Sequence, residues 1–217
     1  GSGGAVYASA ASVLIAGSAF EANGCGEHGC AIWLNFESTG ADDEGSCVVR
    51  DSTFVRNAED RMRSLIYGKS FPDLQFLNIL VADTSVGASA SGLITLSSLT
   101  NVLIAGSTFE NNPTRVIRTF QLFKGEFTVS GCTFRGNKDL VAEGSAGGAA
   151  IFIKEAAMSK LRLVDCIFAD NQFVDGDEDS DKDEGLWSYG GKEQRHSFGW
   201  ETHLDARRGR SVNTHIP

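Results

Sequence analysis

Residues 102–112 read VLIAGSTFENN, and stretches of the same pattern recur along the chain. The other copies are VLIAGSAFEAN at 13–23, CVVRDSTFVRN at 47–57, ILVADTSVGAS at 79–89, FTVSGCTFRGN at 127–137 and LRLVDCIFADN at 161–171. The eighth residue of each copy serves as an anchor, which gives Phe20, Phe54, Val86, Phe109, Phe134 and Phe168. The uneven intervals between these anchors predict a minimal repeating unit of about 23 to 25 residues, lengthened by insertions in some coils.

Apolar and polar residues alternate within every copy. The residues seven and five positions before the anchor are apolar in all six copies, and the residue two before it is small. This period of two, broken once, indicates two short strands joined at a corner. Three before the anchor, each copy has a glycine or an aspartate, residue types that suit a bend: Gly17, Asp51, Asp83, Gly106, Gly131 and Asp165.

Asparagine recurs three residues after the anchor. It is found in five copies, as Asn23, Asn57, Asn112, Asn137 and Asn171, and Ser89 takes its place in the third copy. We expect these asparagines to form an internal ladder of hydrogen bonds when the units stack, beside a ladder of the anchor phenylalanines.

A further short apolar strand precedes most copies. These strands are expected at 5–8, 31–34, 65–67, 93–96, 116–119 and 150–153. Three strands in each unit predict an all-β fold, a right-handed single-stranded parallel β-helix of about six coils. A leucine-rich repeat would need a different order of Leu and Asn, and a propeller blade would need about 40 residues.

Composition agrees with a turn-rich β protein, because 25 glycines accompany only 3 prolines. The formal net charge of −9, without a basic cluster, argues against nucleic-acid binding. No apolar stretch approaches the length of a transmembrane segment, and no signal peptide is present in this sequence. Since the first residues already resemble the middle of the pattern, we expect a fragment of a longer β-helix, with adjoining coils at its N-terminus.

The repeat ends after Asn171, and three regions are predicted. Residues 1–174 form the β-helix, and residues 175–184, DGDEDSDKDE, form an acidic linker. Residues 185–217 are either an irregular tail or a degenerate terminal coil. The linker departs from a calcium-binding loop, since it has no glycine at the required place and no closing glutamate. No metal and no cofactor is therefore expected.

The five cysteines fall into two groups. Cys25 and Cys30 flank a glycine-rich loop, and a disulfide between them is expected if the protein is exported. Cys47, Cys132 and Cys166 occupy inward columns and are interpreted as buried free thiols. Cys132 and Cys166 should stack on adjacent coils, and a bridge between them stays open as an alternative.

These columns resemble the repeats of the chlamydial polymorphic outer-membrane proteins, which carry Gly-Gly-Ala-Ile and Phe-x-x-Asn tetrapeptides. The second motif is present five times, as FEAN, FVRN, FENN, FRGN and FADN, and the first is matched by GGAV at 3–6 and GGAA at 147–150. That family is similar to the wider pectate-lyase-like right-handed β-helix superfamily, and its bacterial members are surface-displayed adhesins. The resemblance implies an extracellular or cell-surface location and a glycan or cell-surface protein as partner.

Candidate catalytic groups are sparse. Asp42, Asp43 and Glu44 lie in the insertion of the second coil, with His28 in an adjacent loop, and form a weak candidate site. Asp51, Asp83 and Asp165 share a column that could hold calcium, but corner positions are the favoured interpretation.

We expect a non-catalytic structural or adhesive rod that presents its insertion loops to a partner or glycan. The alternative is a carbohydrate-active enzyme of the lyase, hydrolase or epimerase type, or a carbohydrate-binding module. An enzyme would bring three or more charged side chains together on the outer face of neighbouring coils.

Overall fold

The computed structural model describes residues 4–9, 12–26, 28–36, 45–59, 62–87, 92–120, 125–140, 149–154 and 160–174 of the chain. It also describes the backbone of four short strands at 188–189, 192–193, 202–205 and 210–213. Over these ranges the regular elements are β-strands, and none of them contains a helix that could cross a membrane.

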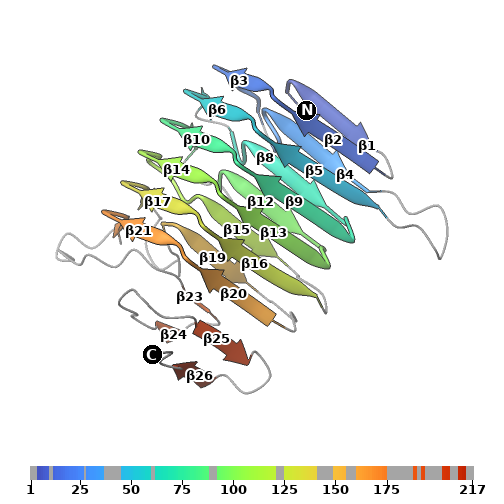
Figure 1. Cartoon of the computed structure of the whole chain (residues 1–217). Helices are drawn as coiled ribbons and strands as arrows, with labels where there is room; N and C mark the ends of the chain where they lie inside the picture. Colours follow the sequence, from blue (N-terminus) through green and yellow to red (C-terminus); the bar gives the residue numbers. More distant parts are fainter. Residues whose placement is uncertain are drawn as a thin grey trace.

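Three sheets run along the molecule, and Figure 1 shows their strands stacked in the order of the chain. Sheet A consists of β1 (Val6–Ser9), β4 (Ile32–Asn35), β8 (Ile66–Lys69), β12 (Ile94–Ser97), β15 (Ile117–Phe120), β19 (Ile151–Lys154), β23 (Ser188–Tyr189) and β24 (Lys192–Glu193). Sheet B consists of β2 (Ser12–Ala16), β5 (Ser46–Arg50), β9 (Asp73–Leu77), β13 (Asn101–Ala105), β16 (Glu126–Ser130), β20 (Lys160–Val164), β25 (Thr202–Asp205) and β26 (Arg210–Asn213).

Sheet C is built from shorter strands. They are β3 (Ala19–Glu21), β6 (Thr53–Val55), β10 (Leu80–Ala82), β14 (Thr108–Glu110), β17 (Thr133–Arg135) and β21 (Ile167–Ala169). Two small parallel pairs join β7 (Ala58–Glu59) to β11 (Ser85–Val86) and β18 (Lys138–Leu140) to β22 (Gln172–Val174). One strand from each large sheet makes one coil, and all pairings between consecutive coils from β1 to β21 are parallel. The predicted parallel β-helix is confirmed.

The core is the interior of this stack. Alternate residues of each strand point inward, and in the central coils they are fully buried, as with Leu34, Phe54, Phe76 and Ile104 at 0% exposure. Anchor phenylalanines stack face to face between coils: the ring centroids of Phe20 and Phe54 are 4.7 Å apart. The rings of Phe109 and Phe134, and those of Phe134 and Phe168, are 4.8 and 4.9 Å apart. Strand β10 aligns with both Phe54 and Phe109, so all five rings lie in one column.

The third coil differs from the predicted alignment. In the structure β10 pairs with β6 and β14 so that Val81, and not Val86, lies opposite Phe54 and Phe109. The residues of β9 therefore fill the sheet B columns that were assigned to Ile79 and Val81, and the prediction was shifted by five residues. With Val81 as the third anchor, the intervals on either side of it become nearly equal. Val86 instead lies in β11, opposite Glu59.

The corners explain why this shift was possible. The corner between sheets B and C has left-handed backbone in every coil, at Gly17, Asp51, Asn78, Gly106, Gly131 and Asp165, with φ between 52° and 59°. A second left-handed corner follows sheet C, at Ala22, Arg56, Asp83, Asn111, Gly136 and Asp170. Asp83 therefore belongs to the second corner and was wrongly placed in the first.

An asparagine ladder runs beside the phenylalanine column. From the second coil on, the Oδ1 atom of each ladder asparagine accepts a hydrogen bond from a backbone N–H of the preceding coil, as Asn171 does from Asn137 at 3.2 Å. Its amide nitrogen donates to the anchor carbonyl of the preceding coil, as from Asn171 to Phe134 at 2.9 Å. Thr84 takes the ladder position of the third coil, because its Oγ1 accepts from the Asn57 N–H at 3.3 Å. Ser89, which was expected there, lies outside the described residues.

Beyond residue 174 only short strands are described. Strand β23 pairs in parallel with β19, and β25 pairs antiparallel with β20. The predicted acidic linker at 175–184 lies outside the described ranges, as does the insertion at 37–44. The division of the chain at 174 and 184 stays a prediction.

Candidate functional site

The outer face of sheet A carries a continuous column of side chains. Strand register places one outward residue of each coil in line, in the order Tyr7, Trp33, Tyr67, Thr95, Arg118 and Phe152. The neighbours of these residues along each strand, such as Ile32 and Leu34, are buried in the core. Because side chains alternate across a strand, the six residues point away from the core. Tyr7 is exposed, but Thr95 and Phe152 are only 1% and 7% exposed, so the column is not open to solvent along its whole length. We refer to Tyr7, Trp33 and Tyr67 as the aromatic row.

The aromatic row is a series of rings in contact. The centroids of Tyr7 and Trp33 are 6.2 Å apart with 20° between the ring planes. Trp33 and Tyr67 are closer, at 4.6 Å and 33°. Tyr7 is 60% exposed, and the other two rings are half-buried. Partial burial raises the pKa of the Tyr67 hydroxyl, and a hydrogen bond to Ser97 on the next coil opposes that rise.

A disulfide loop borders the aromatic row. Cys25 and Cys30 are joined by a disulfide, with a Cα–Cα distance of 5.1 Å. The loop between them carries His28, whose ring centroid is 5.0 Å from that of Tyr67 and 6.4 Å from that of Trp33. Its Nδ1 lies 3.1 Å from the Ser64 Oγ, which also accepts the backbone N–H of Gly29 at 3.1 Å. The hydrogen bonds hold the imidazole at the edge of the row.

Gly29 has a steric role in this loop. Its φ is +68°, and a Cβ at this position would lie 2.9 Å from the Trp33 Cβ and 2.8 Å from the Ile32 carbonyl oxygen. Such contacts are shorter than a side chain tolerates, so a residue larger than glycine would force the loop away from Trp33. The loop therefore approaches the indole closely because residue 29 has no side chain.

Farther along the column, the Arg118 side chain lies next to two aromatic rings. The Arg118 guanidinium carbon lies 4.2 Å from the Phe120 ring centroid and 5.6 Å from that of Phe152. Arg115 lies 4.4 Å from the same Phe152 ring and donates from Nε and Nη2 to the Asp139 Oδ2, at 2.8 and 2.6 Å.

Burial is the largest influence on the pKa values of Arg118 and Asp139. It lowers the pKa of Arg118 to about 10, and the positive charge of Arg115 lowers it further. Burial also raises the pKa of the Asp139 carboxyl, although the ion pair with Arg115 acts in the opposite direction. With 7% and 8% of their side chains exposed, Arg115 and Asp139 are a buried structural pair.

The weak candidate site predicted around His28 stays a prediction, because three of its four residues lie outside the described ranges. His28 lies against Tyr67 and Ser64, whereas Asp42, Asp43 and Glu44 lie outside the described ranges. Within those ranges, no group of three or more His, Cys, Asp or Glu residues is arranged to hold a metal ion.

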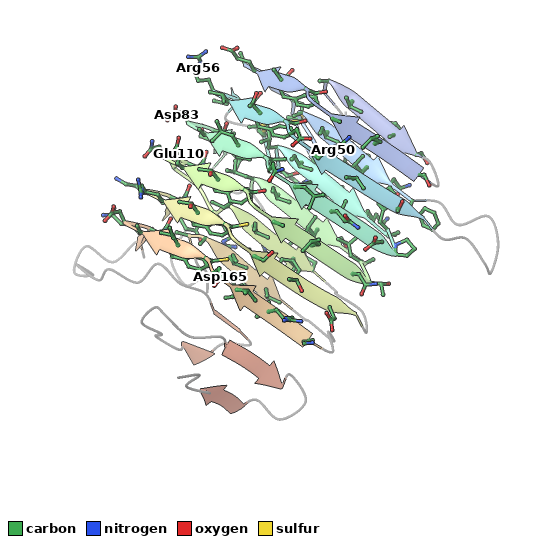
Figure 2. All side chains as sticks on the ribbon, viewed as in Figure 1. Arg50, Arg56, Asp83, Glu110 and Asp165 are labelled. Carbon is green, nitrogen blue, oxygen red and sulfur yellow. A yellow bond between two sulfur atoms is a disulfide. The ribbon has the colours of Figure 1, made fainter. Side chains whose placement is uncertain are left out.

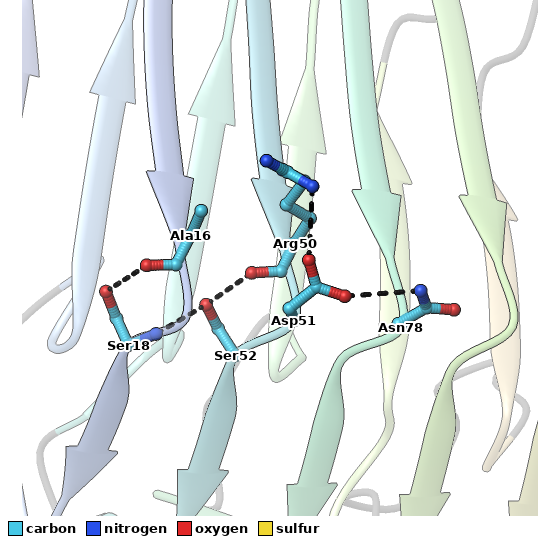
Figure 3. Close-up of polar contacts among 6 residues, drawn as sticks. All are labelled: Ala16, Ser18, Arg50, Asp51, Ser52 and Asn78. Carbon is cyan, nitrogen blue, oxygen red and sulfur yellow. Dashed lines mark hydrogen bonds and ion pairs between the residues drawn. The ribbon is translucent and has the colours of Figure 1, made fainter.

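The aspartates proposed for calcium are also separated. Figure 2 shows Asp83 with Arg56 and Glu110 at the far edge of sheet C, and Asp165 at the corner between sheets B and C. Asp51 accepts a hydrogen bond from the Asn78 amide at 3.3 Å and pairs with Arg50 at 3.3 Å (Figure 3). At the edge of sheet C, Arg56 forms an ion pair with Glu21. Asp51 and Arg56 thus pair with neighbouring side chains, and the three aspartates do not converge on one point.

The aromatic row was missed from the sequence, although a signal for it existed. The apolar strands expected at 5–8, 31–34 and 65–67 contain Tyr7, Trp33 and Tyr67. In each case the aromatic residue follows an inward aliphatic residue, such as Ile32 or Ile66, and must therefore face outward. An outward column of three large aromatics is unusual on a solvent-facing sheet.

Comparison with family models places the chain in a known structural class. The model of the right handed beta helix region matches residues 1–196. The chain therefore belongs to the right-handed β-helix family, which agrees with the three stacked parallel sheets. No curated protein and no solved structure gives a significant match to the chain.

Proposed function

We propose that this chain is a non-catalytic, secreted or surface-exposed β-helix that binds glycans on the outer face of sheet A. The observation that carries the proposal is the aromatic row of Tyr7, Trp33 and Tyr67, three rings in contact on one solvent-facing column. The sequence also predicts that insertion loops, such as residues 37–44, contact a partner.

Sugar rings match the aromatic row in shape and chemistry. A pyranose has an apolar face of C–H groups that packs on an aromatic ring, and hydroxyl groups around its rim that need hydrogen-bond partners. The His28 imidazole borders the row at 5.0 Å from the Tyr67 ring, and tyrosine hydroxyl and imidazole groups are of the chemical type that hydrogen-bonds to sugar hydroxyls. Neighbouring strands are about 4.8 Å apart, so one extended oligosaccharide along the axis can contact several coils.

The proposed location has two supports. The Phe-x-x-Asn and Gly-Gly-Ala motifs resemble those of surface-displayed adhesins, as noted above. Independently, the Cys25–Cys30 disulfide is typical of proteins that reside in an oxidising compartment. A location outside the cytoplasm would also give the aromatic row access to glycans.

The non-catalytic part rests on how charged side chains are arranged. Polysaccharide-cleaving enzymes need an acid and a base at one point, usually with a cation. Here Arg115 and Asp139 neutralise each other in a buried pair, and Arg56 and Glu21 pair at an exposed edge. The aromatic row itself borders no carboxylate among the contacts of the described residues.

The experiment compares glycan binding by the intact chain and two variants. Tyr7→Ala removes the most exposed ring of the row and should weaken binding of the best glycan on an array by about tenfold. The physical reason is the loss of one stacked face, worth about 1.4 kcal/mol for a tenfold change. Leu14→Ala is the matched control, because Leu14 is 65% exposed on the outer face of sheet B, away from the row.

Two outcomes would contradict the proposal. Equal loss of binding in Tyr7→Ala and Leu14→Ala would place the glycan elsewhere, and so would binding that neither variant changes. Incubation of the same polysaccharides with the intact chain should give no new reducing ends or unsaturated products. If cleavage activity persists after further purification of the chain, the non-catalytic assignment is wrong, but the result on glycan binding is unaffected.

A further inference from the structure

Two thiols face each other at the corner between sheets B and C. Cys132 precedes β17 and Cys166 precedes β21, and the register of these strands aligns Thr133 with Ile167. The backbone N–H of Ile167 donates to the Cys132 carbonyl at 2.8 Å, so the two cysteines are direct neighbours on consecutive coils. Neighbouring strands are about 4.8 Å apart, within the Cα–Cα range of about 4.4–6.8 Å that a disulfide spans.

The two sulfur atoms also interact with each other. Each thiol approaches a carbonyl of the coil before it, Cys132 that of Ile104 and Cys166 that of Val129, both at 3.5 Å. The hydrogen bond between the two side chains lowers the pKa of Cys166 to about 7 and raises that of Cys132. Together with the greater exposure of Cys166, this direction favours Cys166 as the thiol that reacts first.

Access to the two thiols is unequal. Cys132 is 1% exposed, whereas Cys166 is half-buried in the last coil, beside the edge strand β21 of sheet C. The third free cysteine, Cys47, is 0% exposed, and burial raises its pKa to about 12. A reagent in solution therefore meets Cys166 first.

We propose that Cys132 and Cys166 form a dithiol site that reacts with small-molecule disulfides, such as oxidised glutathione, and closes to a disulfide between the fifth and sixth coils. The Cys166 thiolate attacks one sulfur of the reagent and displaces the other half, which takes up a proton. Cys132 then loses its proton and attacks the Cys166 sulfur, which releases the second half as a thiol. Two protein thiols are oxidised, and one small disulfide is reduced to two thiols.

The Cys132–Cys166 disulfide would link the sixth coil covalently to the fifth. Cys132 and Cys166 hold equivalent positions on consecutive coils, so the bond closes one whole coil and limits the freedom of the unfolded chain. The same column holds Ser18, Ser52 and Ser107 in three other coils and Ile79 in the third coil. Serine is therefore a substitution that the corner accepts at both cysteine positions.

The experiment uses the full chain with its Cys25–Cys30 disulfide intact. Treatment with oxidised glutathione should reduce the number of alkylatable thiols in the unfolded protein from three to one. A non-reducing peptide map should then show Cys132 linked to Cys166. The melting temperature should rise by about 5 °C or more, since the new bond closes a long loop.

Serine variants define the order of the two steps. Cys132→Ser should stop at a stable glutathione adduct on Cys166, and Cys166→Ser should leave Cys132 unmodified under the same conditions. Cys47→Ser is the matched control and should behave as the unaltered chain does. A map without the Cys132–Cys166 link, or an adduct on Cys47 formed as fast as that on Cys166, would overturn the proposal.

Discussion

The third and fourth coils solve the same packing problem with different residues. At the anchor the fourth coil has Phe109 and the third has Val81, and both are 0% exposed. At the ladder position the fourth coil has Asn112 and the third has Thr84, and both are again fully buried. Both coils have left-handed backbone at the same two corners, so the corners set the path of a coil. A residue of different size is accepted in an interior column when another column of the same coil changes in the opposite direction.

The smaller anchor of the third coil is compensated in sheet B, in the column five residues before the anchor. That column holds Val49, Ile104 and Val129 in the second, fourth and fifth coils, but Phe76 in the third. The third coil therefore places its large ring on sheet B and its small residue on sheet C. The volume enclosed by the coil stays similar, as close packing requires.

The largest effect is expected from Phe109→Ala, which breaks the fourth coil at its anchor. The free energy of unfolding should fall by about 3–5 kcal/mol, because a fully buried ring that stacks on Phe134 is lost. Val81→Ala is the matched change in the third coil and should cost only about 1–2 kcal/mol, since two methyl groups are lost. Urea unfolding followed by circular dichroism measures both. Equal losses would mean that the two anchors are not equivalent positions of one column.

A somewhat smaller effect is expected at the ladder. Asn112→Ala should cost about 2–4 kcal/mol, because it leaves the Thr84 N–H and the Val81 carbonyl buried without their partners. Thr84→Ala removes one acceptor, that of the Asn57 N–H, and should cost about 1–2 kcal/mol. Hydrogen exchange at residues 57 and 84 reports which amide is freed. Glu110→Ala, at the surface of the same coil, is the control and should change stability by less than about 0.5 kcal/mol.

The smallest effect should come from converting the third coil to the pattern of the others. Val81→Phe alone should cost about 1–3 kcal/mol, because Phe76 already occupies the interior. Adding Phe76→Val should recover part of that loss, and the coupling energy in a double-mutant cycle measures the compensation. Additive losses would show that the two columns do not share the same space.

The interior was largely predictable because its residues obey two strict requirements. A buried column must be apolar, and a ladder position needs a side chain that accepts and donates, so Phe54, Phe109, Asn57 and Asn112 repeat visibly. The third coil lacks both markers, and its apolar alternation fits two registers five residues apart. The second corner was not predictable from the sequence, because Ala22 and Arg56 adopt left-handed backbone without the glycine that usually indicates it.

The outer face was predictable only in part. Tyr7, Trp33 and Tyr67 are separated by insertions of different length, so they share a column only once the strands are in register. The contact of the Cys25–Cys30 loop with Trp33 depends on how that loop folds back, which local sequence does not encode. The position of Cys132 and Cys166 on consecutive coils, by contrast, was predictable from the alignment of the fifth and sixth copies, which agrees with the strand register.

Strict alignment of the left-handed corners has a consequence for how such a chain can change its length. From the second to the fifth coil, each coil forms its inter-strand hydrogen bonds and side-chain stacking contacts with the coil before it and the coil after it. Removing one complete turn, corner to corner, would bring together two cross-sections of the same outline, whereas removing one residue within a strand would turn the rest of that strand's side chains to the opposite face. Duplication and loss of whole turns is therefore a mutational route that this architecture accepts, and it would lengthen or shorten the outer face without redesigning the core.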